Sequence, residues 1–514
     1  MASGMDSNKL RMIGTKMLDF VANYWETLDQ RKPFPDLNPG FMNDLASAFL
    51  LIPPSPPNDV EDWEKIFRDI EPVVCNGNTH WQHPNFYAYY PTGCSYHSIV
   101  ADILSAGLAS IGFSWSSSPS MTELELRMTD WIAKVLHLPD IFLNASASPG
   151  GGIIQNTASD ATMVAMLAAR GRAVRRIKQH APCSETTDKY GVISIPENHD
   201  PEIFSRFIAY CSDQAHSSVE KAAMLNGVRL RKLRSERGGE YDNFRITPEV
   251  LEGAIMVKTY NLTYRKNNLI PFILIATVGT TSTCAVDPID ALAPICNREQ
   301  IWVHVDSAYA GSFMICPEYR NMCKDLQLVD SFNTNIHKSL MINFDCSPMW
   351  FKDAQEAIHF FSVQPPYLQH RYQKQTMDYR HLQIALGRRF RSLKIWFVLR
   401  NMGTQELQNY LRKMVDFAKI FENLIKNDPL FELFVPRHLG LVCFRLKNST
   451  NELNSQLYDT INNNRIIHLT SSTVHGETFM RFTICSSKTT EENVRKAYEI
   501  IHETALKVLE AKNA

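Results

Sequence analysis

The 514-residue chain has no long apolar run, no excess of charge of either sign and no CxxC motif. Its longest apolar stretch, residues 269–279, is too short to span a bilayer, and its first residues lack the apolar core of a secretory signal. Lysine plus arginine total 53 and aspartate plus glutamate total 54, so no net field attracts nucleic acid or an anionic membrane. We therefore expect a cytoplasmic protein without a nucleic-acid or membrane partner.

The cysteines argue against two further classes of protein. There are 11 of them, an odd number, and they are widely spaced. This pattern is typical of reduced thiols and not of a disulfide-stabilised fold or a zinc site. We therefore expect no metal ion.

The middle of the chain, residues 96–395, has the pattern of a large α/β domain. Short apolar runs alternate with helix-like stretches, which is typical of a mainly parallel sheet that is buried on both faces. The predicted strands are VISIP (192–196), FIAYCSD (207–213), FILIATVG (272–279), IWVHVDSAY (301–309) and SFNTN (331–335). Residues 353–380 are predicted to be a polar, irregular segment, and a long loop inside a domain is usually functional or disordered.

Two smaller regions flank this domain. Residues 1–95 are predicted to form an N-terminal helical arm, because apolar residues recur at helical spacing over residues 8–31 and proline-rich connections follow. Such an arm often wraps a partner subunit. Residues 396–514 are predicted to form a small α+β domain with strands at 439–447 and 478–487.

A lysine interrupts the uncharged run NTNIHKSLMINF at residues 333–344. Lys338 is costly in apolar surroundings unless it is paired or its pKa is lowered. Asp306 ends a predicted strand earlier in the chain, and functional groups of open α/β sheets gather at the carboxyl ends of strands. On these two residues alone, a structural ion pair and a catalytic pair are equally favoured.

Two further stretches carry candidate binding groups. In SPGGGIIQNTASD, glycines 150–152 are predicted to form a flexible turn before a helix that opens with Asn156, Thr157 and Ser159. Hydroxyl and N–H groups at a helix N-terminus bind anions, although the stretch is neither a Walker A loop nor GxGxxG, and an ordinary capped helix is the commoner interpretation. His216 follows a predicted strand at the start of a helix, where a structural histidine is the commoner interpretation.

Together these groups match the needs of one cofactor. Pyridoxal phosphate requires a lysine that forms a Schiff base, an acid for its ring nitrogen and a phosphate site. A histidine at a neighbouring strand end can stack on its ring. Binding as an imine also explains why a lysine is tolerated in apolar surroundings.

Five motifs, in the order SDQAHSS, HVDSAYAG, NIHKS, FDCSPMW and LGRRFRSLK, resemble those of the group II pyridoxal-phosphate decarboxylases. The resemblance runs from about residue 8 to residue 490 and is strongest to members that act on dopa and 5-hydroxytryptophan. It implies a fold-type I transferase-like fold with a mainly parallel seven-stranded sheet. It also implies a homodimer with active sites at the subunit interface, and decarboxylation of aromatic L-amino acids to amines such as dopamine and serotonin.

The resemblance also implies roles for individual residues. Lys338 would form the Schiff base, Asp306 would pair with the ring nitrogen and His216 would stack over the ring. Tyr367 would return a proton to the substrate carbon after CO2 leaves. The other implied cofactor contacts are Thr157, Ala158, Ser159, Thr281, Ala308, Asn335 and His337. The implied substrate pocket contains Trp81, Tyr89, Tyr90, Pro91, Thr92 and Gly387, with Ile111 and Phe113 reaching in from the neighbouring subunit.

Several related activities stay open, namely those of an aldehyde synthase, a tyrosine or histidine decarboxylase and an aminotransferase. Similar aldehyde synthases tend to have phenylalanine at the position of Tyr367 or asparagine at that of His216, and similar histidine decarboxylases tend to have serine at that of Gly387. An aminotransferase would need an arginine such as Arg481 for the substrate carboxylate. Ser339 and Tyr90 depart from the usual pattern and bear on substrate choice.

Two alternatives belong to other classes of protein. One is a catalytically silent scaffold, against which the set of intact catalytic residues argues. The other is a nucleic-acid binder that uses the basic runs 170–178 or 387–394.

Overall fold

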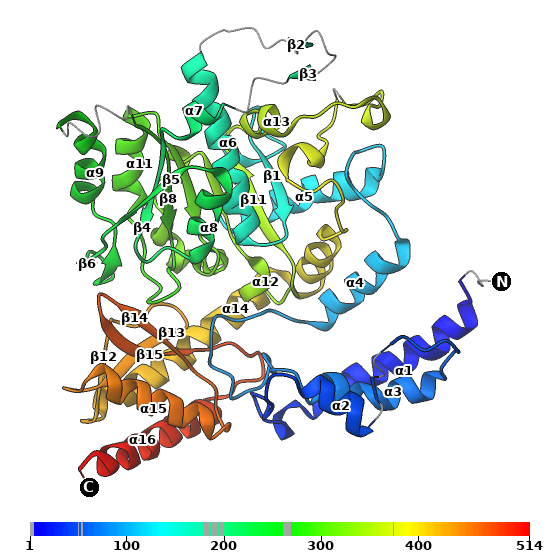
Figure 1. Cartoon of the computed structure of the whole chain (residues 1–514), viewed down its shortest axis with the longest axis vertical. Helices are drawn as coiled ribbons and strands as arrows, with labels where there is room; N and C mark the ends of the chain where they lie inside the picture. The colour runs from blue at the N-terminus through cyan, green and yellow to red at the C-terminus, as the bar shows by residue number, and fades with distance from the viewer. Residues whose placement is uncertain are drawn as a thin grey trace. The chain divides into compact units, whose positions relative to one another are not determined.

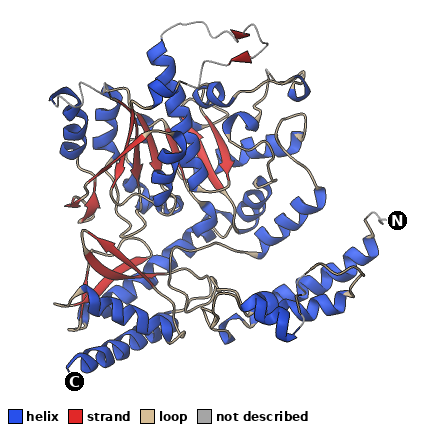
Figure 2. Cartoon of the chain, viewed as in Figure 1, coloured by secondary structure: helices blue, strands red, loops and turns tan. Residues whose placement is uncertain are grey.

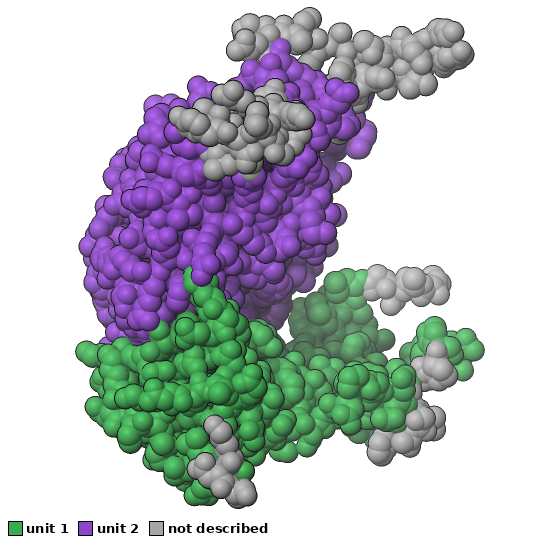
Figure 3. Space-filling view, turned by 60° about the vertical axis from the view of Figure 1, so that its left-hand side comes forward, with its two compact units in different colours: residues 1–91, 417–434, 442–514 green, residues 92–416, 435–441 purple. Residues whose placement is uncertain are grey.

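The computed structural model describes residues 5–49, 51–52, 55–178, 186–187, 193–194, 200–260, 269–373 and 375–513. They fall into two units (Figure 3). Unit 1 comprises residues 1–91, 417–434 and 442–514, and unit 2 comprises residues 92–416 and 435–441. Each unit is described by itself.

Unit 2 is built on a seven-stranded sheet with the order β1-β11-β10-β9-β8-β4-β5. The strands are β1 (Gly151–Gln155), β4 (Phe207–Ser212), β5 (Arg229–Leu233), β8 (Ile270–Thr277), β9 (Trp302–Asp306), β10 (Ser331–Asn333) and β11 (Ser347–Phe351). Only β11 runs against its neighbours, so the prediction of a mainly parallel sheet is confirmed. The predicted strands that correspond to β4, β8, β9 and β10 are also confirmed, because strands buried on both faces consist of continuous apolar runs.

Helices enclose this sheet (Figures 1 and 2). The longer ones are α4 (Tyr96–Leu108), α5 (Pro119–Val135), α6 (Ala158–Lys178), α8 (Ser217–Asn226), α9 (Pro248–Tyr260), α11 (Ile289–Arg298), α13 (Ala354–Phe361) and α14 (Ser392–Asn427), which continues into unit 1. The short ones are α7 (Pro201–Phe204), α12 (Ile336–Ser339), η3 (Asp140–Phe142), η4 (Ala310–Ile315), η5 (Pro317–Cys323), η6 (Leu326–Leu328), η7 (Pro366–Leu368) and η8 (Tyr379–Leu382). The helix α6 packs across β8 and β9 through small residues, among them Ala161, Ala165 and Ala168, which allow a close approach. A two-stranded ribbon, β6 (Glu236–Gly238) and β7 (Asn243–Arg245), completes the unit.

Unit 1 combines N-terminal helices with a sheet formed near the C-terminus. The helices are α1 (Ser7–Glu26), η1 (Leu28–Gln30), α2 (Phe41–Phe49), α3 (Trp63–Ile70), η2 (Glu71–Cys75), α15 (Asn451–Asn463) and α16 (Glu491–Asn513). The sheet has the order β12-β13-β15-β14, with β12 (Phe431–Leu433), β13 (Leu441–Leu446), β14 (Thr470–Val474) and β15 (Glu477–Thr483). Stacked rings hold α14 to this sheet, since Phe421 lies 3.7 Å from Phe482 between centroids. The strands predicted at 439–447 and 478–487 are confirmed as β13 and β15.

The predicted glycine turn at residues 150–152 is wrong. Gly151 and Gly152 are the first residues of the buried strand β1, which pairs with β11. A Cβ atom added at Gly152 would lie 2.8 Å from the Trp350 side chain, and one at Gly150 would lie 1.8 Å from the Ile141 carbonyl oxygen. These glycines therefore allow close packing and do not serve as a hinge.

Two other local predictions need correction. Of the predicted strand at 192–196, the described residues Ile193–Ser194 form β3, which pairs with β2 (Thr186–Thr187) outside the main sheet. The segment 353–380 is not irregular throughout. Asp353 caps the helix α13 by accepting a hydrogen bond from the Gln355 amide, and only the residues after Phe361 lack long regular structure.

The basic side chains of the two runs form ion pairs and hydrogen bonds with other residues of the same chain. In the first run, Arg172 pairs with Asp330, Arg175 with Glu356 and Lys178 with Asp200, and Arg176 donates to the Gln300 carbonyl. In the second run, Arg388 pairs with Glu125, Arg391 with Asp345 and Lys394 with Asp102. These contacts give the runs a structural use. No helix among the described residues is long and apolar enough to cross a membrane.

Candidate active site

The predicted cofactor residues follow strands that end at one edge of the unit 2 sheet. Asp306, the last residue of β9, lies between Thr277 at the end of β8 and Asn333 at the end of β10. Lys338 follows β10 on the short helix α12, and His216 follows β4. Because these strands are parallel, the groups that follow them gather at the same edge.

His216 is fixed by the start of α8. Its Nδ1 atom accepts a hydrogen bond from the Ser218 amide at 3.2 Å and lies 2.8 Å from the Ser218 hydroxyl. An imidazole nitrogen that accepts from an amide carries no proton, so the ring proton resides on Nε2. Burial lowers the pKa of His216, the charge of Asp306 raises it and that of Lys338 lowers it further. The imidazole ring is therefore neutral, and its Nε2–H can donate to a bound group.

Asp306 and Lys338 interact electrostatically at this edge of the unit 2 sheet. Burial raises the pKa of Asp306, and the positive charge of Lys338 acts in the opposite direction. The Ala308 amide donates to Asp306 Oδ1 at 3.1 Å and fixes the carboxyl group. A buried carboxylate is stabilised by a positively charged neighbour. The Asp306 carboxylate can therefore pair with a bound group that carries a proton, such as a protonated ring nitrogen.

The remaining predicted cofactor residues lie on the loops that follow the strands. Thr157 caps α6 by accepting from the Asp160 amide at 3.2 Å, and Ala158 and Ser159 form the first turn. The Asn335 amide donates to the Ala308 carbonyl at 3.1 Å, and Thr281 is exposed after β8. Asn335 Oδ1 and Ser339 Oγ are buried without a hydrogen-bond partner among the described residues.

These observations test whether pyridoxal phosphate fits. A helix N-terminus with an exposed serine can hold the phosphate, and Asn335 Oδ1 has no hydrogen-bond partner among the described residues. His337 Nδ1 accepts from the Cys346 amide at 2.9 Å, so its proton resides on Nε2 and can be donated to an anion. The donor set therefore fits the group.

Two buried histidines near the site predict how stability depends on pH. Burial lowers the pKa of His304 and of His337 to about 3, and Lys338 contributes for His337. The unfolded chain takes up these protons below about pH 6.5, so stability is complete above that pH and falls as the pH decreases. We expect a loss of about 2 kcal/mol per histidine at pH 5, measured by denaturant unfolding at pH 7.5 and pH 5. The variant His304→Gln should lose about 2 kcal/mol less unfolding free energy between pH 7.5 and pH 5 than the parent protein does. An unchanged pH dependence in this variant would contradict the prediction.

The predicted substrate residues are divided between the two units. In unit 1, Trp81 stacks on Tyr89 at 5.1 Å between ring centroids, and Tyr90 is buried next to Pro91. Arg481 belongs to the same unit and is engaged there. It donates to the Thr470 hydroxyl at 2.9 Å and the Tyr89 carbonyl at 3.2 Å, and it lies over the Tyr90 ring.

In unit 2, the predicted substrate residues Gly387 and Ile111 lie close to each other. A Cβ atom added at Gly387 would lie 3.8 Å from the Ile111 side chain, which is ordinary contact. The neighbouring Arg388 is buried and paired with Glu125, which also accepts from the Ile154 amide at 2.8 Å. Phe113 is partly buried nearby along the chain, and Thr92 is the first residue of the unit.

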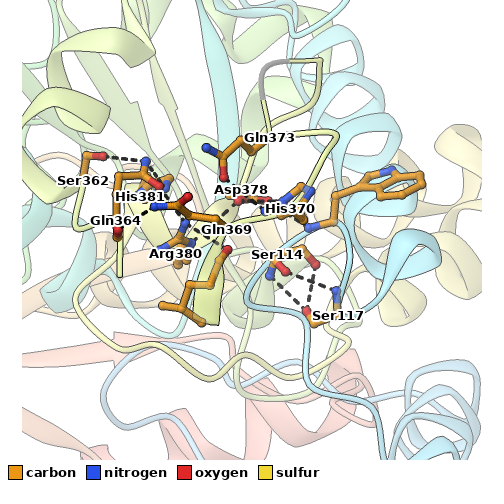
Figure 4. Close-up of polar contacts among 12 residues, drawn as sticks. Ser114, Ser117, Ser362, Gln364, Gln369, His370, Gln373, Asp378, Arg380 and His381 are labelled. Atoms are coloured by element: carbon orange, nitrogen blue, oxygen red, sulfur yellow. Dashed lines mark hydrogen bonds and ion pairs between the residues drawn. The ribbon is translucent and has the colours of Figure 1, made fainter. Parts of the chain in front are cut away.

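Tyr367 is exposed to solvent in this single chain. It sits in η7 (Pro366–Leu368) and is 79% exposed. The segment around it is held by polar contacts that sequence reasoning missed, chiefly from Asp378 and Arg380 (Figure 4). Gly93 was missed too. Its amide donates to the His337 carbonyl, and a Cβ there would lie 2.8 Å from the Ile342 oxygen, so only glycine fits against the lysine-bearing segment.

Comparisons with known proteins identify the family of this chain. A family model described as the pyridoxal-dependent decarboxylase conserved domain matches residues 46–447. The chain is 44% identical to the aromatic-L-amino-acid decarboxylase of Manduca sexta over 99% of this chain and 94% of that protein. The crystal structure of Oryza sativa TDC with PLP and tryptamine is similar, with a TM-score of 0.88 and 32% identity over 99% of both chains. Rhodiola rosea 4-hydroxyphenylacetaldehyde synthase has a TM-score of 0.85 and 32% identity over 98% of this chain and 99% of that one. The chain therefore belongs to the pyridoxal-dependent decarboxylase family.

Proposed function

We propose that this chain decarboxylates aromatic L-amino acids of the dopa and 5-hydroxytryptophan class, giving amines such as dopamine and serotonin and CO2. The observation that carries the proposal is the placement of Asp306 between two parallel strand ends, with Lys338 and His216 following neighbouring strands. The aromatic-L-amino-acid decarboxylases of Manduca sexta and Cavia porcellus, 44% and 43% identical, support the substrate class.

The proposed mechanism assigns each step to a group of this chain. Lys338 would hold the cofactor covalently, and Asp306 would keep the proton on its ring nitrogen. Bound pyridoxal phosphate supplies an electron sink for the breaking bond between Cα and the carboxylate. His216, neutral with its proton on Nε2, would contact the cofactor ring and orient the substrate. Tyr367 then gives its hydroxyl proton to Cα, which completes the amine.

The variant Tyr367→Phe tests this assignment. A positioned acid contributes about 10²–10⁴-fold, so amine formation should fall by that factor. We expect aldehyde, ammonia and hydrogen peroxide to replace the amine, because the substrate carbon that lacks its proton donor is oxidised by O2, and water then releases the aldehyde and ammonia. The measurement quantifies amine, aldehyde and peroxide together from a panel of aromatic amino acids and histidine. Tyr372→Phe, in the same segment, is the control, and amine formation retained in Tyr367→Phe would exclude this role.

An aldehyde synthase is the second candidate, because the Rhodiola rosea enzyme has the same TM-score, 0.85, as Catharanthus roseus tryptophan decarboxylase. Tyr367 and His216 favour the decarboxylase. If the parent protein itself produces aldehyde with stoichiometric peroxide, the second candidate is correct. An aminotransferase is disfavoured because Arg481 already donates to Thr470 and Tyr89 within unit 1.

We propose that the enzyme is a homodimer. The helix α4 carries an apolar face that the single chain leaves uncovered, in which Tyr96, Val100, Ile103, Leu104 and Leu108 are 41–68% exposed. Such a contiguous apolar face is typical of an interface. Ile111, 57% exposed, continues this face toward the predicted substrate residues, which suits an active site shared between subunits.

The variant Ile103→Asp tests the dimer. A charge buried at an interface is costly, so we expect the sedimentation mass to fall from twice the chain mass to the mass of one chain. Met224→Asp, 75% exposed on α8, is the control and should stay dimeric. A dimer that is equally stable in both variants would contradict the role of α4.

The expected cytoplasmic location rests on the cysteines, since all ten described ones are free thiols.

A further inference from the structure

A row of polar side chains lies behind Asp306 on one face of the unit 2 sheet. Every second side chain of a strand points to the same face, so Trp302, His304 and Asp306 of β9 share one. The parallel register places Asn333 of β10 beside Asp306, and it places Ser331 beside His304. These five buried residues form the polar row, which runs from the middle of the sheet to the proposed cofactor site.

The helix α6 covers this face of the sheet. The Arg172 guanidinium of α6 lies 4.4 Å from the centroid of the Trp302 ring. Trp302 also belongs to the same apolar cluster as Ala161 and Ala165 of α6. The polar row is therefore shielded from water on this side, and hydrogen bonds in such surroundings are stronger than those in water.

The far end of the polar row fixes the proton of His304. The Trp302 indole N–H donates to Ser331 Oγ at 2.8 Å, and His304 Nδ1 lies 2.8 Å from the same oxygen. His304 Nδ1 is thus the acceptor that the described residues offer to the buried Ser331 hydroxyl. Burial lowers the pKa of His304 to about 3, so the ring is neutral and carries one proton. This proton resides on Nε2, at the other end of the ring.

Asn333 connects His304 to Asp306. Burial lowers the pKa of His304 and raises that of Asp306, and the Asn333 side chain opposes both changes. A neighbour that raises the pKa of a histidine accepts a hydrogen bond from it, whereas one that lowers the pKa of a carboxyl group donates to it. The amide of Asn333 can therefore accept from His304 and donate to Asp306. Every donor of the polar row then points toward the carboxylate.

The bonds next to the carboxylate are not closed. His304 Nε2 and both polar atoms of the Asn333 side chain are buried without a partner at hydrogen-bond distance among the described residues. Such groups are rare and costly, and a purely structural link between β9 and β10 would have these bonds formed. Donors and acceptors of this kind suit a functional site, where hydrogen bonds often shorten only when the bound group is in place.

We propose that Asn333 and His304 are positioning residues that hold the Asp306 carboxylate in its charged form for the ring nitrogen of the cofactor. The inference rests on the proposed role of Asp306. Neither residue would touch the cofactor. They act through the carboxylate, because a chain of donors that all point one way stabilises the negative charge at its end.

The first test uses the full-length protein loaded with pyridoxal phosphate that is labelled with 15N at its ring nitrogen. The 15N chemical shift reports whether this nitrogen is protonated, independently of activity. Asn333→Leu keeps the approximate shape of the side chain and removes both polar atoms. We expect its 15N signal to move toward that of the unprotonated ring. Hydrogen bonds to charged groups are strong, so the Kd for pyridoxal phosphate should rise by about tenfold or more.

A matched control separates this effect from general destabilisation. Asn226→Leu makes the same change at another buried asparagine of unit 2, at the end of α8. It should leave the 15N signal unchanged and the Kd within about twofold.

A second pair of variants tests His304 and decides the question if Asn333→Leu does not fold. His304→Leu removes the N–H, whereas His304→Gln retains an N–H group at a similar reach. We expect His304→Leu to shift the 15N signal in the same direction as Asn333→Leu, and His304→Gln to restore most of the parent signal. Equal signals in the two His304 variants would overturn the role of this histidine.

A double-mutant cycle with Asp306→Asn shows whether the polar row acts through the carboxylate. In that background Asn333→Leu should change the Kd by less than about twofold. An unchanged 15N signal in both Asn333→Leu and His304→Leu, or losses of affinity that multiply in the double variant, would overturn the inference. If Asp306→Asn itself leaves the ring nitrogen protonated, the proposed role of Asp306 fails. If Asp306→Asn shifts the signal and the other variants do not, only the role of the polar row fails.

Discussion

Replacement of Lys338 by alanine is expected to reduce amine formation by about 10⁴-fold or more, as when a covalent catalytic group is removed. Alanine cannot bind the cofactor covalently, and the positive charge beside Asp306 and His216 disappears with it. The rate is measured at saturating pyridoxal phosphate, so that weaker binding is not mistaken for lost chemistry.

A second readout tests the covalent link directly. Borohydride reduction of the parent protein should fix the cofactor to a peptide that contains Lys338, detected by mass spectrometry, and Lys338→Ala should carry no such adduct. Lys221→Ala removes an exposed lysine from α8 and serves as the control. An adduct of unchanged amount in Lys338→Ala would place the cofactor on another lysine and disprove the assignment.

The variant Asp306→Asn should lower kcat/KM for amine formation by about 10²–10³-fold. Asparagine preserves shape but cannot carry the charge that keeps a ring nitrogen protonated. Because Asp306 also raises the pKa of His216, its loss should lower that pKa further. The histidine shift can be followed by NMR independently of activity.

A surface acid provides the matched control for this variant. Asp290→Asn makes the same chemical change on the exposed side of α11 and should leave kcat/KM within about twofold. If Asp306→Asn behaves like Asp290→Asn, the carboxylate does not serve the ring nitrogen, and the buried acid has a structural role.

The strands of the large sheet could be predicted where burial on both faces produces an apolar run, as in β4, β8 and β9. The strands β1 and β11 were not predicted, for a physical reason. The first opens with Gly151 and Gly152, and the second contains Pro348, and both residue types argue against a strand. Here they are tolerated because the glycines make room for Trp350 and because Pro348 needs only to accept, from the Thr334 amide.

Prediction of the candidate site from the sequence has the same limit. Residues such as Asp306 and Lys338 stand out because they are charged within apolar runs. Asp378 and Arg380 do not, because DYRH looks like any polar surface stretch until the fold buries it. Their contacts to Trp115 and Val363 join segments that no local pattern links.

The buried pair of Arg388 and Glu125 has a consequence for how this enzyme can change during evolution. It anchors the chain beside Gly387 to the sheet, while position 387 itself faces Ile111 with room for a small side chain. A mutation at 387 therefore alters the shape of the proposed pocket wall without displacing it. New substrate preferences can be sampled there by single substitutions, at little risk to the fold that selection must preserve.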